Sequence, residues 1–505
     1  MKILLVVYDN DSHISYFPLG TAYIASACRN AGHDVKIFSQ DVYHWPEADL
    51  TNLLDHERFD LVGIGTIGGY YQYAKLLKLS EAINGSKQRP FYVIGGHGPS
   101  PEPGYFLKKT GADAVVIGEG EETIKELLRA IEGKQDVSEI KGIAYLKDEK
   151  PFYTLKREPI ADFNKLPLPD FSLVRYAKVK IYPVGRIRGC GMDCEFCTVK
   201  GKPRCASPER LLEQISFLLE TNDARHFFIV DDLFGQQREE TLRFCNMLRD
   251  YQKNTGRRLD VAVQIRLDKA KDTELLSAMR QASINTVAIG FESPIEEELT
   301  AMNKHLRPED MIALARIFHK FGFLIHGMFI FGYPLKEGVD FKMSAKERIK
   351  RFKSFIYRSK IDTIQILLPG PLPGTELRRR LVRQNRVYPL EDVGWEYYDG
   401  NFPLFEPDEP LTAEEMQASI RKIMGKFYQF KYMFIIGLHI FSFPALIFFL
   451  HNIQLGWRKW YRPWRNNLVR FGGWIIMKQW ISQFRKDNFS QRLQRAKEHL
   501  RTKAK

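Results

Sequence analysis

The stretch Cys190-Gly191-Met192-Asp193-Cys194-Glu195-Phe196-Cys197 places three cysteines at spacings of four and three residues. At this spacing three thiolates can converge within one loop, and thiolate sulfur is the ligand that iron–sulfur clusters select. Three sulfur ligands on a four-iron cluster leave one iron open to bind and reduce a small molecule. The alternatives are three unrelated buried thiols or a structural zinc knuckle, for which no obvious fourth ligand lies close by. We therefore take Cys190, Cys194 and Cys197 as candidate ligands of a [4Fe–4S] cluster.

The rest of the chain is long and contains few other cysteines. Its 505 residues predict two or three domains. Six cysteines, three of them in one loop, do not resemble a disulfide framework, so we expect a reducing cytoplasm. Met1 and Lys2 lead directly into an apolar run at 3–7 that has the pattern of a buried strand, and no secretory signal is expected.

Residues 1–145 alternate short apolar runs with helical segments. The expected strands are 2–7, 34–38, 61–64, 91–94 and 114–117, and expected helices cover 19–31 and 73–83. Apolar runs separated by helices predict an α/β fold with a doubly wound, parallel, Rossmann-like sheet. Glycine-rich turns at 63–69 and 95–98 follow two of the strands, at the edge where such sheets bind ligands. A structural domain without a ligand stays an alternative.

Residues 146–175 are polar and then proline-spaced, which is typical of a linker. Strand–helix alternation resumes over residues 176–387, with expected strands at 179–184, 226–230, 260–264, 286–289, 325–331 and 363–367. Ser207 is placed to cap a helix over 208–221. Six strands with polar or glycine residues at their carboxyl ends predict a partial (β/α)6 barrel of the TIM type. The active site of such a barrel lies on that face.

The cysteine stretch resembles the cluster loop of radical S-adenosylmethionine (SAM) enzymes, which reads CxxxC-x-aromatic-C after the first barrel strand. In that family the aromatic residue, here Phe196, lies near the adenine of SAM. The resemblance implies that Asp231, Asp232 or Glu292 holds the ammonium or ribose of SAM. Arg266 would pair with the SAM carboxylate. A structural ion pair or cap is the alternative for each of these four, and the two adjacent aspartates stand where many members have Gly-Gly-Glu.

The N-terminal segment is similar to the cobalamin-binding domain that is fused ahead of many radical SAM enzymes. The runs that carry the similarity are Pro18–Tyr23, Val93–His97 and Gly118–Glu121. The residues that would contact cobalamin are Gly95, Gly96, His97, Gly118, Glu119 and Gly120. Many such domains carry DxHxxG, whose histidine ligates cobalt, but the run Asp11-Ser12-His13-Ile14-Ser15-Tyr16 ends in tyrosine. We expect His13 to be a loop residue, and a domain that has lost cobalamin stays an alternative.

Residues 388–505 are expected to form a helical, basic, membrane-associating region. Residues 421–505 hold eighteen Lys and Arg against Asp487 and Glu498, a surplus above the net charge of +14 of the whole chain. The apolar run at 433–450 lies at the lower limit for a bilayer-spanning helix and has basic flanks on both sides. Tryptophans among cations suit the headgroup layer of an anionic membrane. A buried core helix followed by a solvated basic helix is one alternative, and RNA binding is a poorer one.

Together these features resemble the cobalamin-dependent radical SAM enzymes over about residues 1–410. Hopanoid C-methylases and the anaerobic cyclase of magnesium-protoporphyrin ester share this layout. The resemblance implies a [4Fe–4S] cluster, SAM and cobalamin as cofactors, and an electron donor such as flavodoxin or ferredoxin. Cleavage of SAM would give a 5′-deoxyadenosyl radical that abstracts hydrogen from an unactivated carbon. We expect C-methylation of a lipid or other hydrophobic substrate at the inner face of the membrane, with no nucleic acid partner.

Three other functions stay open. The first is a non-methylating reaction, such as ring closure or oxidation, on a hydrophobic or tetrapyrrole substrate. The second is RNA modification by an enzyme of the methylthiotransferase type. That family places three further cysteines in its N-terminal domain, where this chain has only Cys28. The third is a non-enzymatic cobalamin- or lipid-binding module, which leaves the cysteine triplet unexplained.

Overall fold

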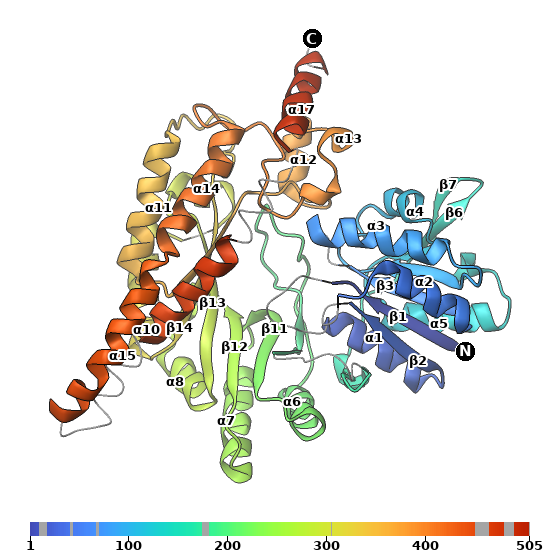
Figure 1. Cartoon of the computed structure of the whole chain (residues 1–505), viewed down its shortest axis with the longest axis horizontal. Coiled ribbons are helices and arrows are strands. Elements are labelled where there is room, and N and C mark those ends of the chain that lie inside the picture. The colour runs from blue at the N-terminus through green and yellow to red at the C-terminus, as the bar shows by residue number, and fades with distance from the viewer. Residues whose placement is uncertain are drawn as a thin grey trace.

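In the computed structural model, the described residues are 1–9, 18–40, 44–66, 70–173, 181–304, 306–449, 464–478 and 489–503. Two α/β units lie side by side, and C-terminal helices run along the outside of the second unit and over the junction (Figure 1). The run around His13 lies outside the described residues, as do Trp457, Trp460, Tyr461 and Trp480.

The first unit contains a seven-stranded sheet with the order β2-β1-β3-β4-β5-β6-β7. Its strands are β1 (Lys2–Val7), β2 (Asp34–Ser39), β3 (Leu61–Gly65), β4 (Phe91–Gly95), β5 (Ala114–Val116), β6 (Ile143–Lys147) and β7 (Lys150–Tyr153). Strands β1 to β5 pair in parallel, whereas β6 and β7 form an antiparallel hairpin at one edge. The sheet therefore continues past residue 145, and the linker predicted from 146 begins only after β7. The short polar run read as linker is the turn and second strand of this hairpin.

Helices cover both faces of this sheet. They are α1 (Leu19–Asn30), α2 (Glu47–His56), α3 (Tyr70–Asn84), α4 (Pro103–Thr110) and α5 (Glu121–Glu132). Alternate residues of β1 point to opposite faces. Ile3 and Leu5 join the core beneath α1 and α5, whereas Leu4 and Val6 join the core beneath the other three helices. A strand buried on both faces has a continuous apolar sequence, as residues 3–7 do.

The second unit is an open barrel of six parallel strands with the order β15-β14-β13-β12-β11-β8. The strands are β8 (Tyr182–Val184), β11 (His226–Phe234), β12 (Asp260–Ile265), β13 (Ile284–Glu292), β14 (Leu324–Ile330) and β15 (Thr363–Leu367). The helices are α6 (Pro208–Asn222), α7 (Arg238–Thr255), α8 (Thr273–Gln281), α9 (Glu296–Ala301), α10 (Pro308–Lys320), α11 (Ala345–Ser359) and α12 (Glu376–Arg383). Ser207 caps α6 by accepting a hydrogen bond from the Arg210 amide. The doubly wound sheet, the partial barrel and this helix cap are confirmed.

A small antiparallel ribbon follows β8. It consists of β9 (Ile187–Arg188) and β10 (Arg204–Cys205), and it encloses residues 189–203. These residues contain all three cysteines of the triplet. We call the two strands and the residues between them the cysteine hairpin.

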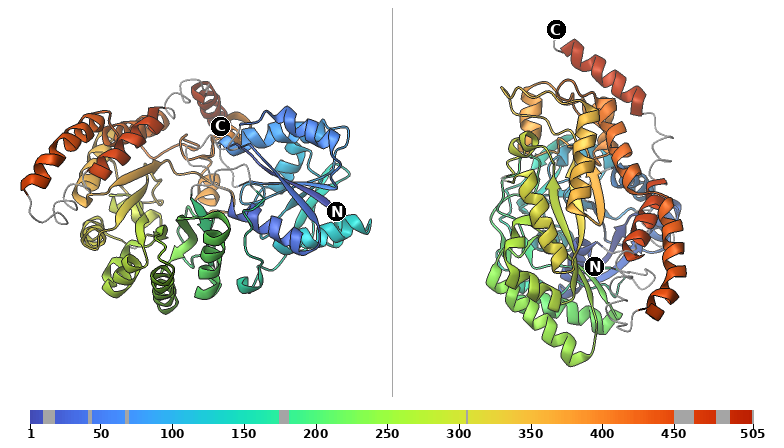
Figure 2. Two further views of the ribbon diagram at one scale, coloured as in Figure 1. Left: turned by 60° about the horizontal axis from the view of Figure 1, so that its bottom comes forward. Right: turned by 90° about the vertical axis from the view of Figure 1, so that its left-hand side faces the viewer.

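The C-terminal part is helical where it is described. Its helices are α13 (Leu390–Val393), η4 (Trp395–Tyr397), α14 (Ala413–Phe427), α15 (Lys431–Phe449), a helix over 464–478, and α17 (Phe489–Lys503). Helix α15 and the helix over 464–478 lie on the outside of the barrel, while α17 stands apart from them at the junction (Figure 2). There Phe489 packs 4.7 Å from Tyr397 and 4.6 Å from Phe402. Among the described residues, no helix is long and apolar enough to span a bilayer.

Candidate active site

The cysteine hairpin holds Cys190, Cys194 and Cys197, all three partly exposed. Burial raises the pKa of the Cys194 and Cys197 thiols, and the nearby Cys190 raises both further. No three Cys, His, Asp or Glu side chains of the described ranges are gathered closely enough to hold a metal ion. The thiols thus share one loop without converging on a point. The donor set, three accessible thiols beside the cations Lys200 and Lys304, fits an iron–sulfur cluster.

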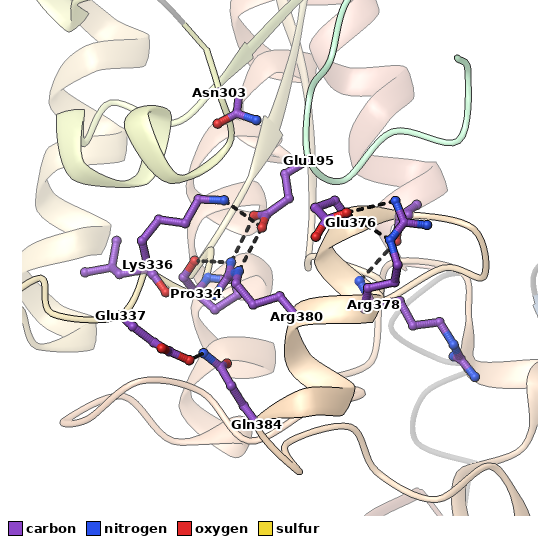
Figure 3. Close-up of polar contacts among 12 residues, drawn as sticks. Glu195, Asn303, Pro334, Lys336, Glu337, Glu376, Arg378, Arg380 and Gln384 are labelled. Carbon is purple, nitrogen blue, oxygen red and sulfur yellow. Dashed lines mark hydrogen bonds and ion pairs between the residues drawn. The ribbon is translucent and has the colours of Figure 1, made fainter. Parts of the chain in front are cut away.

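Glu195, between the second and third cysteines, is fully buried and ion-paired (Figure 3). Arg380 of α12 donates from Nε to Oε1 at 2.7 Å and from Nη2 to Oε2 at 2.9 Å. Lys336 Nζ and the Tyr333 hydroxyl each donate to the carboxylate at 2.7 Å. Burial acts to raise the pKa of Glu195, but these donors hold it below its usual value. Because the donors follow β14 and β15, Glu195 fixes the cysteine hairpin to the carboxyl end of the barrel.

Asp231 and Asp232 lie inside β11, which continues to Phe234 beyond the predicted strand end, and they bind backbone amides of the cysteine hairpin region. Asp231 Oδ1 accepts from the amides of Arg186 at 2.6 Å and Ile187 at 2.9 Å, and Asp232 Oδ2 accepts from Gly189 at 2.6 Å. Asp231 Oδ2 is buried and has no hydrogen-bond partner among the described residues. Burial raises the pKa of Asp231 to about 6. The two carboxylates thus position the hairpin, and a role toward SAM stays a prediction.

Arg266 and Glu292 also lie close to the cysteines. Arg266 follows β12 and pairs with Asp268 at 2.7 Å. Glu292 ends β13 with φ +62°, a left-handed conformation that is costly for a residue with a side chain. Its carboxylate pairs with Lys304 Nζ at 3.0 Å, and both groups are close enough to Cys194 to affect its pKa. Glu292 thus lies in a strained backbone conformation close to the cysteines, and its role toward SAM stays a prediction.

Phe196, expected near the adenine, is half-buried and packs edge-on against Tyr333 with ring centroids 6.1 Å apart. Tyr333 belongs to the Gly332-Tyr333-Pro334 turn after β14 and also binds Glu195. The aromatic position of the motif is therefore supported from the barrel side. Of the remaining cysteines, Cys205 lies on β10 and Cys245 is buried in α7.

The carboxyl edge of the first sheet presents glycine backbone. Gly96 has φ +103°, and a Cβ there would lie 2.0 Å from the Thr66 carbonyl oxygen, so only glycine fits. The Thr66 hydroxyl is buried and has no partner in the part of the chain that is described. A Cβ at Gly118 would meet nothing within 4 Å. Gly95 and the exposed His97 adjoin Gly96. Bare backbone beside an unpaired hydroxyl fits the approach of a large polar ring such as cobalamin.

Glu119 and Gly120 follow the same edge, but the Glu119 carboxylate turns toward the cysteine hairpin and binds Arg188 and Arg204. Sequence analysis did not assign a role to either arginine, to Lys304 or to Glu195. Arg188 stands two residues before the first cysteine, which was the available signal. Its partners lie in the other unit, so no local pattern could supply them.

Comparison with known proteins agrees with both halves of this arrangement. Residues 1–128 match the B12 binding domain family, and residues 184–347 match the radical SAM superfamily. The fold and the cysteine hairpin thus define a radical SAM enzyme with a cobalamin-binding unit. The chain thus carries a B12-binding domain followed by a radical SAM domain, and its cofactors are a [4Fe–4S] cluster, SAM and cobalamin.

Individual relatives cover different shares of the chain. An uncharacterized methyltransferase of Pyrococcus horikoshii, PH0819, is 28% identical over 445 residues, which are 85% of this chain and 92% of that protein. Hopanoid C-2 methylase of Rhodopseudomonas palustris is 29% identical over 231 residues, 45% of this chain and 42% of the methylase. The structure of the methyltransferase TsrM from Kitasatospora setae, with cobalamin and a [4Fe–4S] cluster bound, superposes with a TM-score of 0.65. That match has 16% identity and covers 76% of this chain and 78% of TsrM.

Proposed function

We propose that this enzyme methylates an unactivated carbon of a lipid or other hydrophobic substrate at the inner, cytoplasmic surface of the membrane. When bound, the reduced cluster supplies the electron that cleaves SAM, and methylcobalamin carries the methyl group. The cysteine hairpin, which carries the cluster ligands, is bonded to the cobalamin-binding unit through Arg188 and Arg204. Similarity to proteins named as methyltransferases supports methyl transfer. The nature of the substrate rests on a different observation, an apolar surface on the C-terminal helices.

The described C-terminal helices expose an unusual amount of apolar surface. Among the side chains between 430 and 476 that the structure describes, ten large hydrophobic ones are exposed, and Phe441, Leu438 and Phe434 are 85%, 68% and 61% exposed. We call the set the apolar C-terminal surface; it consists of Phe430, Met433, Phe434, Leu438, Ile440, Phe441, Leu468, Val469, Ile475 and Ile476. Soluble proteins seldom leave so many large apolar side chains together in water, so the surface indicates a partner that covers it.

The charge around this surface selects the partner. Residues 421–486 contain twelve Lys and Arg and no acidic residue. Of these cations, Lys422, Lys426, Lys431 and Lys478 are exposed. Apolar side chains that enter the acyl boundary and lysines that meet anionic headgroups are the two parts of an interfacial membrane anchor. An anionic lipid surface therefore matches both the apolarity and the charge.

Hydrogen bonds join the helices of the apolar C-terminal surface to the barrel. The Tyr428 hydroxyl donates to the Ile364 carbonyl of β15 and accepts from its amide, both at 2.8 Å. From the helix over 464–478, Asn466 Nδ2 donates to Asp362 at 2.7 Å. These contacts attach the lipid-binding helices beside the outer strand of the barrel, which supports delivery of a membrane-borne substrate to the same molecule that carries the cysteine hairpin.

Product analysis tests the reaction. Anaerobic enzyme is reduced by flavodoxin or ferredoxin and supplied with cobalamin, SAM deuterated at its methyl group, and host lipid extract. The proposal predicts 5′-deoxyadenosine and S-adenosylhomocysteine together with a lipid heavier by one labelled methyl. 5′-Deoxyadenosine without S-adenosylhomocysteine would instead assign a non-methylating reaction such as ring closure or oxidation. Neither product from enzyme with an intact cluster would reject the lipid substrate.

Vesicle flotation tests the membrane surface separately from catalysis. Wild-type protein should float with phosphatidylcholine vesicles that contain phosphatidylglycerol, and less with phosphatidylcholine alone. The double variant F434E/F441E should remain at the bottom, because each buried aromatic side chain contributes about 2 kcal/mol. L155E is the matched control, since Leu155 is 75% exposed but lies in the first unit. Flotation of F434E/F441E equal to wild type would reject the membrane role. If the wild-type protein is a dimer and F434E/F441E is a monomer, the surface would instead be an interface with a second copy of the chain.

A further inference from the structure

Two acidic residues of the cobalamin-binding unit form ion pairs with the two strands of the cysteine hairpin. Arg188 of β9 and Arg204 of β10 stand opposite each other in the ribbon, one on each side of the loop that holds the cysteines. Both side chains pair with Glu119 in the turn after β5, and Arg188 pairs in addition with Glu121, the first residue of α5. The hairpin that carries the cluster ligands is thus bonded to the other unit of the molecule.

Glu119 has no acceptor capacity left for a cofactor. Its Oε1 accepts from Arg188 Nη1 at 3.1 Å and from Arg204 Nη2 at 2.8 Å. Its Oε2 accepts from Arg204 Nη1 at 2.9 Å and from the Ile160 amide at 2.6 Å. A carboxylate has about four lone-pair sites, and all four are used here. The residue expected to contact cobalamin is therefore committed to the hairpin.

The second carboxylate completes the charge balance. Glu121 Oε1 accepts from Arg188 Nη2 at 2.5 Å, and its side chain is only 6% exposed. Like charges directly opposite each other in a ribbon repel, so the two arginines alone would open the hairpin base. Two carboxylates balance two guanidinium groups. The centroid of the Phe163 ring lies 4.7 Å from Arg188 Cζ and 5.0 Å from Arg204 Cζ, so the ring packs against both guanidinium groups.

We infer that Glu119 and Glu121 are positioning residues for the iron–sulfur cluster, and that they set the location of the cysteine hairpin relative to the cobalamin edge. The same turn begins with Gly118, where an added Cβ would meet nothing within 4 Å. The glycine of the cobalamin edge and the carboxylate that holds the cysteine hairpin are therefore adjacent residues of one turn. The inference rests on the family assignment and not on the proposed lipid substrate.

Variants on the two sides of the network test this inference. E119Q keeps the acceptor for the Ile160 amide but removes the charge that holds the arginines, and R204Q removes the opposite partner. R204K keeps a charge without the forked geometry. E126Q is the control. Glu126 lies on α5 with Glu121, but its partner Arg157 lies outside the cysteine hairpin. The readouts are iron and sulfide per chain, the electron paramagnetic resonance spectrum of the reduced cluster with and without SAM, and cobalamin affinity from absorbance titration.

E119Q and R204Q should each reduce cluster retention under a chelator by at least about fivefold, with R204K intermediate. The double variant should be no worse than either single variant, because the two residues act through one contact. Cobalamin affinity should stay within about twofold of wild type, the E126Q protein should match wild type, and circular dichroism should report folded protein throughout. The inference is overturned if E119Q weakens cobalamin binding tenfold while the cluster spectrum is unchanged, or if the effects of E119Q and R204Q add.

Discussion

Glu195 and Arg380, 185 residues apart in the sequence, form a buried two-point ion pair between the cysteine loop and α12. The residue that anchors the loop thus occupies the unspecified position x of the CxxxC-x-aromatic-C motif. Arg380 donates in addition to the Pro334 carbonyl at 3.0 Å, so the ends of two barrel strands share the contact. The loop is held in place by protein contacts, and its cysteines do not have to position it.

Substitution of Glu195 tests this anchor. E195Q should lower the free energy of unfolding by about 3 kcal/mol, because it leaves the guanidinium of Arg380 buried without its counter-charge. Urea unfolding of the metal-free protein measures the change without any cofactor. E376Q is the control, since Glu376 lies on the same helix but pairs with Arg379 at the surface, and a change below about 1 kcal/mol is expected. Equal effects of the two variants would contradict the anchor.

The iron content of cysteine variants should distinguish the cluster ligands from the other cysteines. C190S, C194S and C197S should each abolish the reconstituted cluster, since a four-iron cluster held by three thiolates has no spare protein ligand. C205S should retain full iron and sulfide, because Cys205 faces the environment of Arg186 and Asp231 rather than the triplet. Iron and sulfide assays with absorbance spectra after anaerobic reconstitution measure this. Loss of the cluster in C205S would show that the ligand set is wrong.

The first sheet offers a backbone test of the cobalamin edge. G96A should destabilise the protein by at least about 2 kcal/mol, because the new methyl group would overlap the Thr66 carbonyl and the residue must keep φ +103°. Cobalamin affinity, measured by absorbance titration, should fall with it. G20A is the matched control: Gly20 lies in α1 with open space around it, so alanine should be neutral or slightly stabilising. G96A protein with wild-type stability would contradict the close approach.

Burial of Asp231 predicts a pH dependence of stability. Its folded-state pKa of about 6 lies above the ordinary value of 3.8, so the folded protein binds the proton more tightly than the unfolded chain. This contribution is complete below about pH 4 and is lost as the pH rises through about 6. The D231N variant should therefore gain stability relative to wild type between pH 4 and 7, by up to about 3 kcal/mol. Urea unfolding across this range checks it, and a pH-independent difference would refute it.

The fold could be predicted because each barrel strand and each of the parallel strands β1 to β5 has its own local apolar pattern. The same locality explains the misplaced linker. Residues 146–153 are polar because β6 and β7 form an edge hairpin that is largely exposed, so burial leaves little signal there. The cysteine spacing is also local and identified the cluster loop. Glu119 shows the limit of such reasoning, because its partners Arg188 and Arg204 are brought to it only by the packing of one unit on the other.

The return of α17 to the junction has a mechanical consequence for the exposed helices. Helix α14 is fixed to the barrel before them, and α17 is fixed after them through Phe489 and the ion pair of Lys497 with Glu414 at 2.8 Å. The segment that carries the exposed apolar helices is thus attached to the rest of the protein at both of its ends. A segment attached at one end would let the enzyme rotate on any surface that the segment bound. Attachment at both ends restricts that rotation. A protein truncated before α17 would keep the exposed apolar side chains of these helices but would lose its fixed orientation on that surface.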